Sequence, residues 1–367
     1  MTAKAHSKCK THRRMTVKQD NVRVAGAIGV DLGDQRSQVC VLDGDGDVVE
    51  EATIATNWSA FERKFGSLER SRVVLETGTH ANWVHDLLTK IGHEVIVANA
   101  RKVRAISANE RKSDTVDARI LARLGRVDIE LLQPVTVRAE QIRLDLSVTR
   151  ARAALVETRT HLVNSVRGLA KTSGHRLPTC SAASLHKQPL DESLKPALAP
   201  LLEMLEQISK KISEYDKQVV ELCKTRYPQT RLLSQVKGVG PLTSLYFVLV
   251  IADPERFKRA RDVGAYFGLV PRRDQSGGRD PELRISKTGD RMGRTLLVQC
   301  AHHILGPFGE DSDLRRFGQK LAARGGKTAK RRAVVATARK LAVLLFALLC
   351  SSEVYEPLRN GAKSVAN

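Results

Sequence analysis

The sequence predicts an α/β sheet domain, an antiparallel coiled-coil hairpin and a mainly helical domain, in that order. Short apolar runs alternate first with turns and then with amphipathic helical patterns up to about residue 130. At Leu144 the apolar spacing changes to steps of three and four, which is typical of a heptad seam. From Arg231 the pattern is mainly helical and is interrupted by a Gly-, Pro- and Arg-rich stretch. We therefore expect a tail at 1–23, a sheet domain at 24–130, a hairpin at 138–226, a helical domain at 229–350 and a tail at 351–367.

The sheet domain is expected to open with a meander of three strands. Two short apolar runs lie at 27–33 and 38–42, and Gly44–Asp45–Gly46 turns the chain into a third run that starts at Val48. Helices and strands then alternate, and Asn57 is placed to cap the first helix. The expected later strands are 72–76 and 94–98, and the expected helices cover about 81–91, a segment around Val103, and 115–124.

Two heptad seams predict the hairpin, and a break containing Pro and Ser at 173–200 separates them. The first seam comprises Leu144, Val148, Ala151, Leu155, Leu162, Val166 and Leu169. The second comprises Leu198, Leu201, Leu205, Ile208, Ile212, Tyr215, Val219 and Leu222. Heptads do not distinguish a partner helix in the same chain from one in a second chain, so a dimer contact is an open alternative. The last helix, at 331–349, is expected to belong to the core.

Composition and charge limit the functional classes. The chain has 367 residues, 42% of them hydrophobic, and no apolar run reaches the roughly 20 residues that cross a bilayer. The first residues lack the apolar segment of a secretory signal. The six cysteines form no close pair, and Cys9 with His12 is at best half a zinc site. We therefore expect reduced thiols and a cytoplasmic protein associated with the nucleoid, not a membrane or secreted protein.

The net charge of +21 favours a polyanion as partner, because Lys and Arg that neutralise phosphates release counterions. The tail at 1–23 carries +6 and the stretch 229–350 carries +13, whereas 24–228 is nearly neutral. The back half is therefore the first region in which we expect phosphate contacts. The tail could hold RNA or have no fixed structure, and the sequence gives no role for His302 and His303.

Four acidic residues of the front half predict a metal site. Asp31 lies in an apolar strand, where an ionised carboxylate is costly unless it is compensated, and Glu76 ends another strand. Asp114 and Asp117 share one face at the head of a helix. Four converging carboxylates would repel one another unless Mg²⁺ neutralised them, and two such ions can activate an oxygen nucleophile at a phosphodiester. Each acid alone also suits an ordinary structural role, and the helix pair could simply favour the helix dipole.

The back half holds candidates for phosphate binding and for a nucleophile. Lys237, Gly238 and Gly240 precede an apolar helix in a pattern typical of a helix-hairpin-helix turn, where glycines let backbone N–H groups approach phosphate. A plain turn fits that pattern equally well. Ser276 stands in a Gly-rich loop, and a hydroxyl among guanidiniums suits phosphoryl chemistry. Ser286 is a rival nucleophile. The surrounding basic residues are Arg272, Arg273, Arg279, Arg284, Lys287, Arg291 and Arg294.

From Ala27 to Leu349 the chain resembles transposases of the insertion-sequence family numbered 110, the bridge-RNA-guided serine recombinases. Asp31, Glu76, Asp114 and Asp117 match the DEDD tetrad of the family's RuvC-like (RNase H-fold) domain, and the stretch 111–122 is similar to its third motif. The signature GL…P-x4-SG of the family's transposase domain is matched by Gly268, Leu269, Pro271, Ser276 and Gly277.

The resemblance implies a function. The tetrad would bind Mg²⁺ and assist Ser276, which would attack a DNA phosphate to give a 5′-phosphoserine and a free 3′-hydroxyl. Donor and target DNA would be chosen by a structured noncoding bridge RNA through base pairing. Family members assemble as dimers and tetramers with composite sites. Two other functions stay open: a metal-dependent nuclease of Holliday-junction resolvase type with water as attacker, and a non-catalytic nucleic-acid-binding protein.

Overall fold

The computed structural model describes residues 26–99, 113–276 and 283–359 of the chain. The chain divides into two compact units, with the border between Val137 and Arg138. Several sequence expectations fall on residues outside those described. These are the tail at 1–23 with Cys9 and His12, the helix near Val103, and the positions Gly277 and Arg279.

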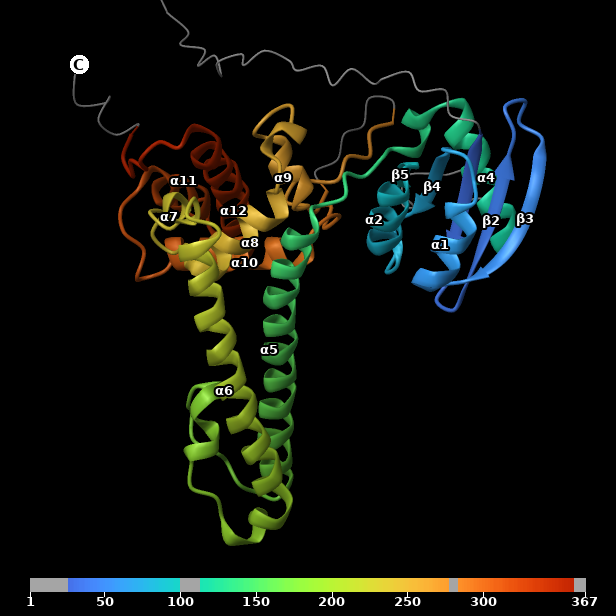
Figure 1. Cartoon of the computed structure of the whole chain (residues 1–367). Helices are drawn as coiled ribbons and strands as arrows, with labels where there is room; N and C mark the ends of the chain where they lie inside the picture. Colours follow the sequence, from blue (N-terminus) through green and yellow to red (C-terminus); the bar gives the residue numbers. More distant parts are fainter. Residues whose placement is uncertain (1–25, 100–112, 277–282, 360–367) are drawn as a thin grey trace, which may run out of the picture. The chain divides into compact units, whose positions relative to one another are not determined.

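The first unit contains a five-stranded mixed sheet in the order β3-β2-β1-β4-β5 (Figure 1). The meander of β1 (Ala27–Leu32), β2 (Arg36–Leu42) and β3 (Val48–Ala55) is antiparallel. Strands β4 (Arg72–Glu76) and β5 (Glu94–Ala98) run parallel to β1. The predicted strands are therefore confirmed, and β2 begins two residues earlier than expected.

Helices cover both faces of this sheet. On one face, α1 (Trp58–Gly66) and α2 (Ala81–Ile91) bury their apolar stripes against Ile28 and Val30 of β1. On the other face lies α4 (Asp114–Val127), which is followed by the short 3-10 helix η1 (Ile129–Leu132). Asn57 caps α1 as predicted, because its side chain accepts a hydrogen bond from the backbone N–H of Ala60 at 2.9 Å.

Two long helices, α5 (Glu140–Thr172) and α6 (Lys195–Thr225), run side by side and form the expected antiparallel hairpin (Figure 1). Their connection holds two 3-10 helices, η2 (Ala182–Lys187) and η3 (Glu192–Leu194). The seam expected on α5 is wrong at both ends, because the side chains of Leu144 and Leu169 are about half exposed. Of the predicted seam, Val166 is fully buried, and the other buried residues of α5 are Asp145, Leu146, Thr149 and Ala170.

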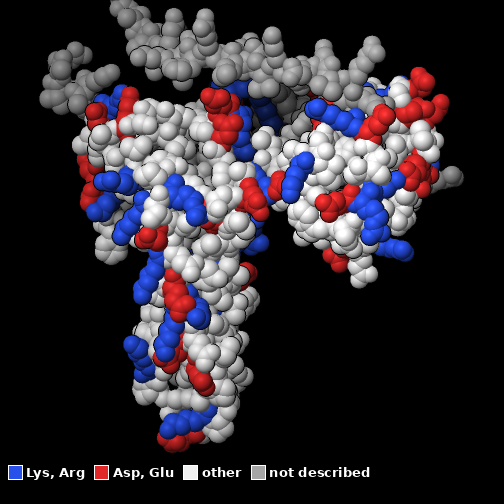
Figure 2. Space-filling view, viewed as in Figure 1, with Lys and Arg blue, Asp and Glu red and all other residues white. Residues whose placement is uncertain are grey.

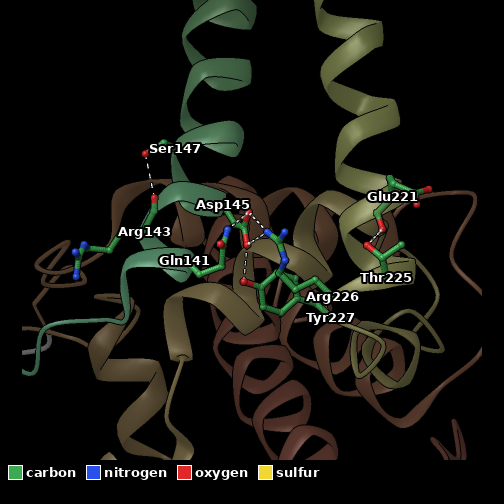
Figure 3. Close-up of polar contacts among 8 residues, drawn as sticks. All are labelled: Gln141, Arg143, Asp145, Ser147, Glu221, Thr225, Arg226 and Tyr227. Carbon is green, nitrogen blue, oxygen red and sulfur yellow. Dashed lines mark hydrogen bonds and ion pairs between the residues drawn. The ribbon is translucent and has the colours of Figure 1, made fainter.

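A buried carboxylate joins the base of the hairpin (Figure 3). Asp145 of α5 is 4% exposed and accepts hydrogen bonds from Arg226 at 2.7 and 2.8 Å and from the hydroxyl of Tyr227 at 2.7 Å. The amide of Gln141 donates a fourth, longer bond at 3.3 Å. Burial, and then the neighbouring carboxylate of Asp145, raises the pKa of Tyr227 well above its usual range. The cluster therefore fixes α5 to the chain that follows α6.

The helical body completes the second unit. Its central helix α8 is buried over nine of its eleven residues, and it packs with α10 and the last helix, α12, in one apolar core. The elements are α7 (Thr230–Leu233), α8 (Pro241–Ile251), η4 (Pro254–Arg256), α9 (Asp262–Tyr266), α10 (Arg291–Leu305), α11 (Asp313–Ala322) and α12 (Gly326–Ser351).

By length and composition alone, α12 could cross a membrane, which the sequence expectation did not anticipate. Core helices have the same composition, and 44% of the most apolar window of α12 is buried inside the structure. Leu341 and Leu345 are fully buried in the core, as predicted for this helix. The five cysteines in the described parts are free thiols.

Candidate active site

Two of the four acids lie at the carboxyl ends of neighbouring strands, at the same edge of the sheet. Strands β1 and β4 are parallel, and their last paired residues are Val30 and Leu75. Asp31 and Glu76 each come directly after that pair, at the carboxyl ends of the strands. Side chains alternate between the faces of a sheet, so Asp31 shares a face with Gly29, and Glu76 shares that face with Val74.

That face is the one on which α4 packs. A methyl group at Gly29 would lie 1.9 Å from the carbonyl oxygen of Ala118, so only a glycine allows α4 to approach β1 this closely. Farther along the helix, a methyl group at Gly125 would meet the side chain of Val74 at 2.3 Å. The backbone carbonyl of Gly125 also accepts a hydrogen bond from Arg72 at 3.0 Å. The end of α4 is therefore held at the beginning of β4.

Since α4 ends where β4 begins, its head points toward the edge that bears Asp31 and Glu76. Asp114 and Asp117 occupy the first turn of α4, and Ser113 caps it. Asp114 is exposed, whereas Asp117 is only 5% exposed. The backbone thus brings all four acidic positions to one end of the sheet. In the parts of the chain that the structure describes, no three His, Cys, Asp or Glu side chains lie close enough together to hold an ion.

Ser276 lies on a two-stranded arm, formed by 268–276 and 283–289 of the second unit. The two sides pair through backbone hydrogen bonds, from Arg272 to Arg284 at 2.9 Å and from Ser286 to Val270 at 2.8 Å. Ser276 follows this paired region and is exposed. Ser286 is partly buried and accepts a hydrogen bond from the hydroxyl of Thr288 at 2.9 Å. The two serines therefore differ in accessibility.

The base of this arm is held tightly. Gly268 and Gly289 have positive φ angles of +66° and +96°. A methyl group on either glycine would lie about 2 Å from a backbone oxygen, at 2.1 Å and 2.0 Å respectively. Asp290 then caps α10 and accepts a hydrogen bond from the buried hydroxyl of Tyr246 at 2.9 Å. Burial, and then the charge of Asp290, raises the pKa of Tyr246. These contacts fix the direction in which the arm leaves the core.

The predicted phosphate-binding cations occupy different surroundings. Arg272, Arg273, Arg284 and Lys287 lie on the arm and are exposed, as is Arg291 at the head of α10. Arg294 is partly buried and donates a hydrogen bond to the carbonyl of Phe267 at 3.0 Å, so this guanidinium holds the base of the arm.

The predicted helix-hairpin-helix turn connects α7 to α8. Gly238 has φ +93°, and a methyl group there would lie 2.9 Å from Nδ1 of His303, so His303 packs against this turn. Gly240 is exposed and faces open space, directly before α8. Lys237 is exposed and forms an ion pair with Glu310 at 2.9 Å. The backbone at Gly240 is therefore open on that side.

One part of the basic back half was not singled out among the phosphate-binding candidates. The stretch from residue 314 to 352 contains ten Lys or Arg and no acidic residue. It covers α11 and α12, and Lys327, Lys330 and Arg331 are exposed on the first turns of α12. The signal was available, because the absence of acids can be read from the sequence. The apolar second half of the helix predicts a core helix, and only the structure shows that its first turns are exposed.

Comparison with known proteins identifies related transposases. A family model described as DEDD transposase of IS110 type matches residues 28–173, and one described as Transposase IS116/IS110/IS902 family matches residues 230–315. The transposase for insertion sequence element IS1111A of Coxiella burnetii is 28% identical over 339 residues, covering 89% of this chain and 90% of the relative. A probable family 20 transposase of Pseudomonas aeruginosa is 27% identical over 340 residues, covering 90% and 98%.

Another relative has a different name. The pilin gene-inverting protein of Moraxella bovis is 24% identical over 293 residues, covering 77% of this chain and 81% of the relative. The two family models cover the carboxylate-bearing sheet and the Ser276 arm respectively, in the order expected from the sequence. The chain therefore belongs to the IS116/IS110/IS902 family of insertion-sequence transposases.

Proposed function

We propose that this transposase cuts and rejoins DNA through a 5′-phosphoserine intermediate on Ser276, with Mg²⁺-dependent help from Asp31, Glu76, Asp114 and Asp117. The observation that carries the proposal is the placement of these four acids at one end of a mixed sheet, which we interpret as an RNase H-like (RuvC-like) domain. The exposed hydroxyl of Ser276 on a firmly based, arginine-rich arm supports the assignment of the nucleophile. We also propose that the chain has the three domains expected from its sequence, with limits at 24–130, 138–226 and 229–350.

The chemistry of the donor set suits magnesium, because all four side chains offer carboxylate oxygens, the ligands that Mg²⁺ prefers. The four side chains would have to come closer together than they lie in the described structure. When bound, the metal would supply charge neutralisation at the phosphate and lower the pKa of an attacking oxygen. The carboxylates would hold it.

The reaction conserves the phosphoester bond. The Oγ of Ser276 would attack phosphorus and give up its proton, while the bond from phosphorus to the 3′-oxygen breaks and that oxygen takes a proton. Exposed guanidiniums of the arm, such as Arg272 and Arg284, would stabilise the charge that develops on the phosphate oxygens. Attack of another strand's 3′-hydroxyl on the phosphoserine would then restore the serine.

The partners follow from the same reasoning. We infer that donor and target DNA are gripped through their phosphates by the arm, by the turn at Gly240 and by the basic start of α12. We also infer guidance by a bridge RNA, assembly as a homodimer or tetramer, and a cytoplasmic, nucleoid-associated location. The pilin gene-inverting relative supports a reaction that rejoins DNA as well as cutting it.

Replacing the nucleophile tests the proposal. With donor DNA, target DNA, bridge RNA and Mg²⁺, Ser276→Ala should abolish strand exchange, whereas the matched variant Ser286→Ala should keep it. If Ser276→Ala still cleaves DNA and Asp31→Asn does not, water is the attacker and the protein is a metal-dependent nuclease. If neither Ser276→Ala nor Asp31→Asn changes the products, the proposed site is wrong.

A further inference from the structure

Both tryptophans of the chain lie in one small aromatic cluster of the first unit. Trp58 begins α1 and Trp83 lies in α2, and their rings stack with centroids 5.3 Å apart and planes 28° apart. Trp58 is 56% exposed, although exposing so large an apolar ring is unfavourable. One stacked ring therefore presents an open face to solvent. This pair is named the tryptophan platform below.

The platform is held in place from beneath. The ring of Trp83 meets the edge of the fully buried Phe61 at 5.4 Å, and Phe61 stacks in turn on Phe65. The indole N–H of Trp83 donates to Nδ1 of His80 at 3.0 Å, and Nε2 of His80 lies 3.4 Å from a carboxylate oxygen of Asp34. These contacts hold Trp83, and Trp58 stacks on it, so the platform is formed before any ligand arrives and little ordering is needed for binding.

The platform adjoins the sheet edge that bears the acids. His80 lies four residues after Glu76 in the chain, and Asp34 lies three residues after Asp31. Thr56, just before α1, donates from its backbone to Gln35 and from its hydroxyl to Gly33, both at 2.9 Å. The turns that follow β1, β3 and β4 are thus tied together, and the platform is built on them.

The chemistry around the platform favours a nucleobase. Asn57 and Ser59 beside Trp58 are exposed polar residues, so the apolar surface is about one ring wide, far below the roughly 800 Å² per partner of a stable protein interface. Arg36 is exposed and lies across from Ala55 at the end of β3, within the same group of turns, where a guanidinium can meet a phosphate. Flat aromatic rings with a nearby cation are how proteins hold unpaired bases.

We infer that the tryptophan platform stacks an unpaired base of the DNA strand that this transposase processes. A base that leaves the duplex near the cut would be held against Trp58, beside the acidic end of the sheet. The identity of the ligand as DNA rests on the function of the family. The binding itself requires neither Mg²⁺ nor Ser276, so it can be tested separately from catalysis.

Tryptophan fluorescence gives a direct readout, because no other tryptophan exists in the chain. The full-length protein is titrated in EDTA with single-stranded oligothymidylate, with its RNA counterpart and with a blunt duplex. We expect the single-stranded DNA to quench the fluorescence to saturation and the duplex to quench it much less. Trp58→Ala should weaken DNA binding, measured by anisotropy of a labelled strand, by about 5- to 150-fold. Trp58→Phe should recover most of the affinity.

A matched control is available in the second unit. Phe308 is another exposed aromatic residue, and Phe308→Ala should leave the affinity for single-stranded DNA unchanged. Equal affinity of Trp58→Ala and the parent protein would overturn the inference, as would quenching by RNA alone. A change in the oligomeric state of Trp58→Ala without any quenching by DNA would also overturn it and assign the ring to a protein contact. Binding of single-stranded DNA to Trp58 does not depend on Ser276. Failure of the proposed serine mechanism would therefore leave the binding measurements unchanged.

Discussion

At the scale of single residues, Asp117 is the acid whose environment says most. It lies in the first turn of α4, on the helix that Gly29 allows to approach β1, and it is 5% exposed. It is the more buried of the two acids on this helix, so the metal role that we propose for it is the one most open to a direct test.

Replacing this carboxylate by its amide tests the role directly. Asp117→Asn keeps the size of the side chain but removes the charge, so we expect strand exchange to fall at least about 100-fold, the effect of removing one strong stabilising interaction from the transition state. Calorimetric titration with Mg²⁺ should show weaker binding. The matched variant Asp45→Asn changes an exposed acid in the turn between β2 and β3 and should leave both quantities unchanged. Unchanged Mg²⁺ binding by Asp117→Asn would remove this residue from the site.

Much of the residue-level site was predictable and some of it was not. Asp31 and Glu76 could be placed because Asp31 lies within one short apolar run and Glu76 ends another, and such runs become neighbouring strands in an α/β sheet. The role of Gly29 could not, because it depends on a contact with Ala118, nearly ninety residues away in the sequence. The tryptophan platform likewise depends on two helices that meet only in the folded sheet.

At the scale of elements, the hairpin shows where heptad reasoning fails. Five of the eight residues of the second seam are buried on α6. On α5, by contrast, Leu144 is exposed and the neighbouring Asp145 is buried, because the base of α5 packs against the helical body. A heptad pattern records only a partner helix, whereas this end of α5 also contacts α8 and the turn that holds Tyr227. The polar cluster of Asp145, Arg226 and Tyr227 (Figure 3) therefore stands where the heptad pattern predicts apolar contacts.

The stability of the hairpin base can be measured by chemical unfolding. Asp145→Ala leaves the buried hydroxyl of Tyr227 without its acceptor, so we expect the free energy of unfolding to fall by about 2 kcal/mol. The matched variant Asp216→Ala breaks the pair that Arg152 makes between the same two helices, where the carboxylate is half exposed, and should cost less than about 1 kcal/mol. Equal effects of the two variants would contradict the importance of burial.

At the scale of the whole molecule, the charge is divided between two kinds of surface. On the face shown in Figure 2, basic and acidic side chains are mixed along the hairpin. On the hairpin, Lys195, Lys210 and Lys211 each pair with a glutamate. The stretch from residue 314 to 352 has no acids at all. The total charge of +21 was known from the sequence, but which lysines are already neutralised appears only in the fold.

This division predicts a specific salt dependence. Changing Lys327, Lys330 and Arg331 to alanine should reduce the slope of log affinity for duplex DNA against log salt by up to about 2.7, because each phosphate that is no longer neutralised lowers the slope by about 0.9. The matched triple variant at Lys195, Lys210 and Lys211 should leave the slope nearly unchanged. Filter binding over a salt series measures both. Equal slopes for the parent and the α12 variant would exclude the start of α12 from the DNA-binding surface.

The most direct measurement for the whole account is the covalent intermediate. Protein is incubated with Mg²⁺, bridge RNA and a DNA substrate nicked near the cleavage site to trap the adduct, then digested and analysed by mass spectrometry. The account predicts a nucleotide 5′-phosphate attached to the peptide that contains Ser276, absent without Mg²⁺ and absent in Asp31→Asn. Cleaved DNA with no modified peptide, or a phosphate attached at Ser286, would contradict it.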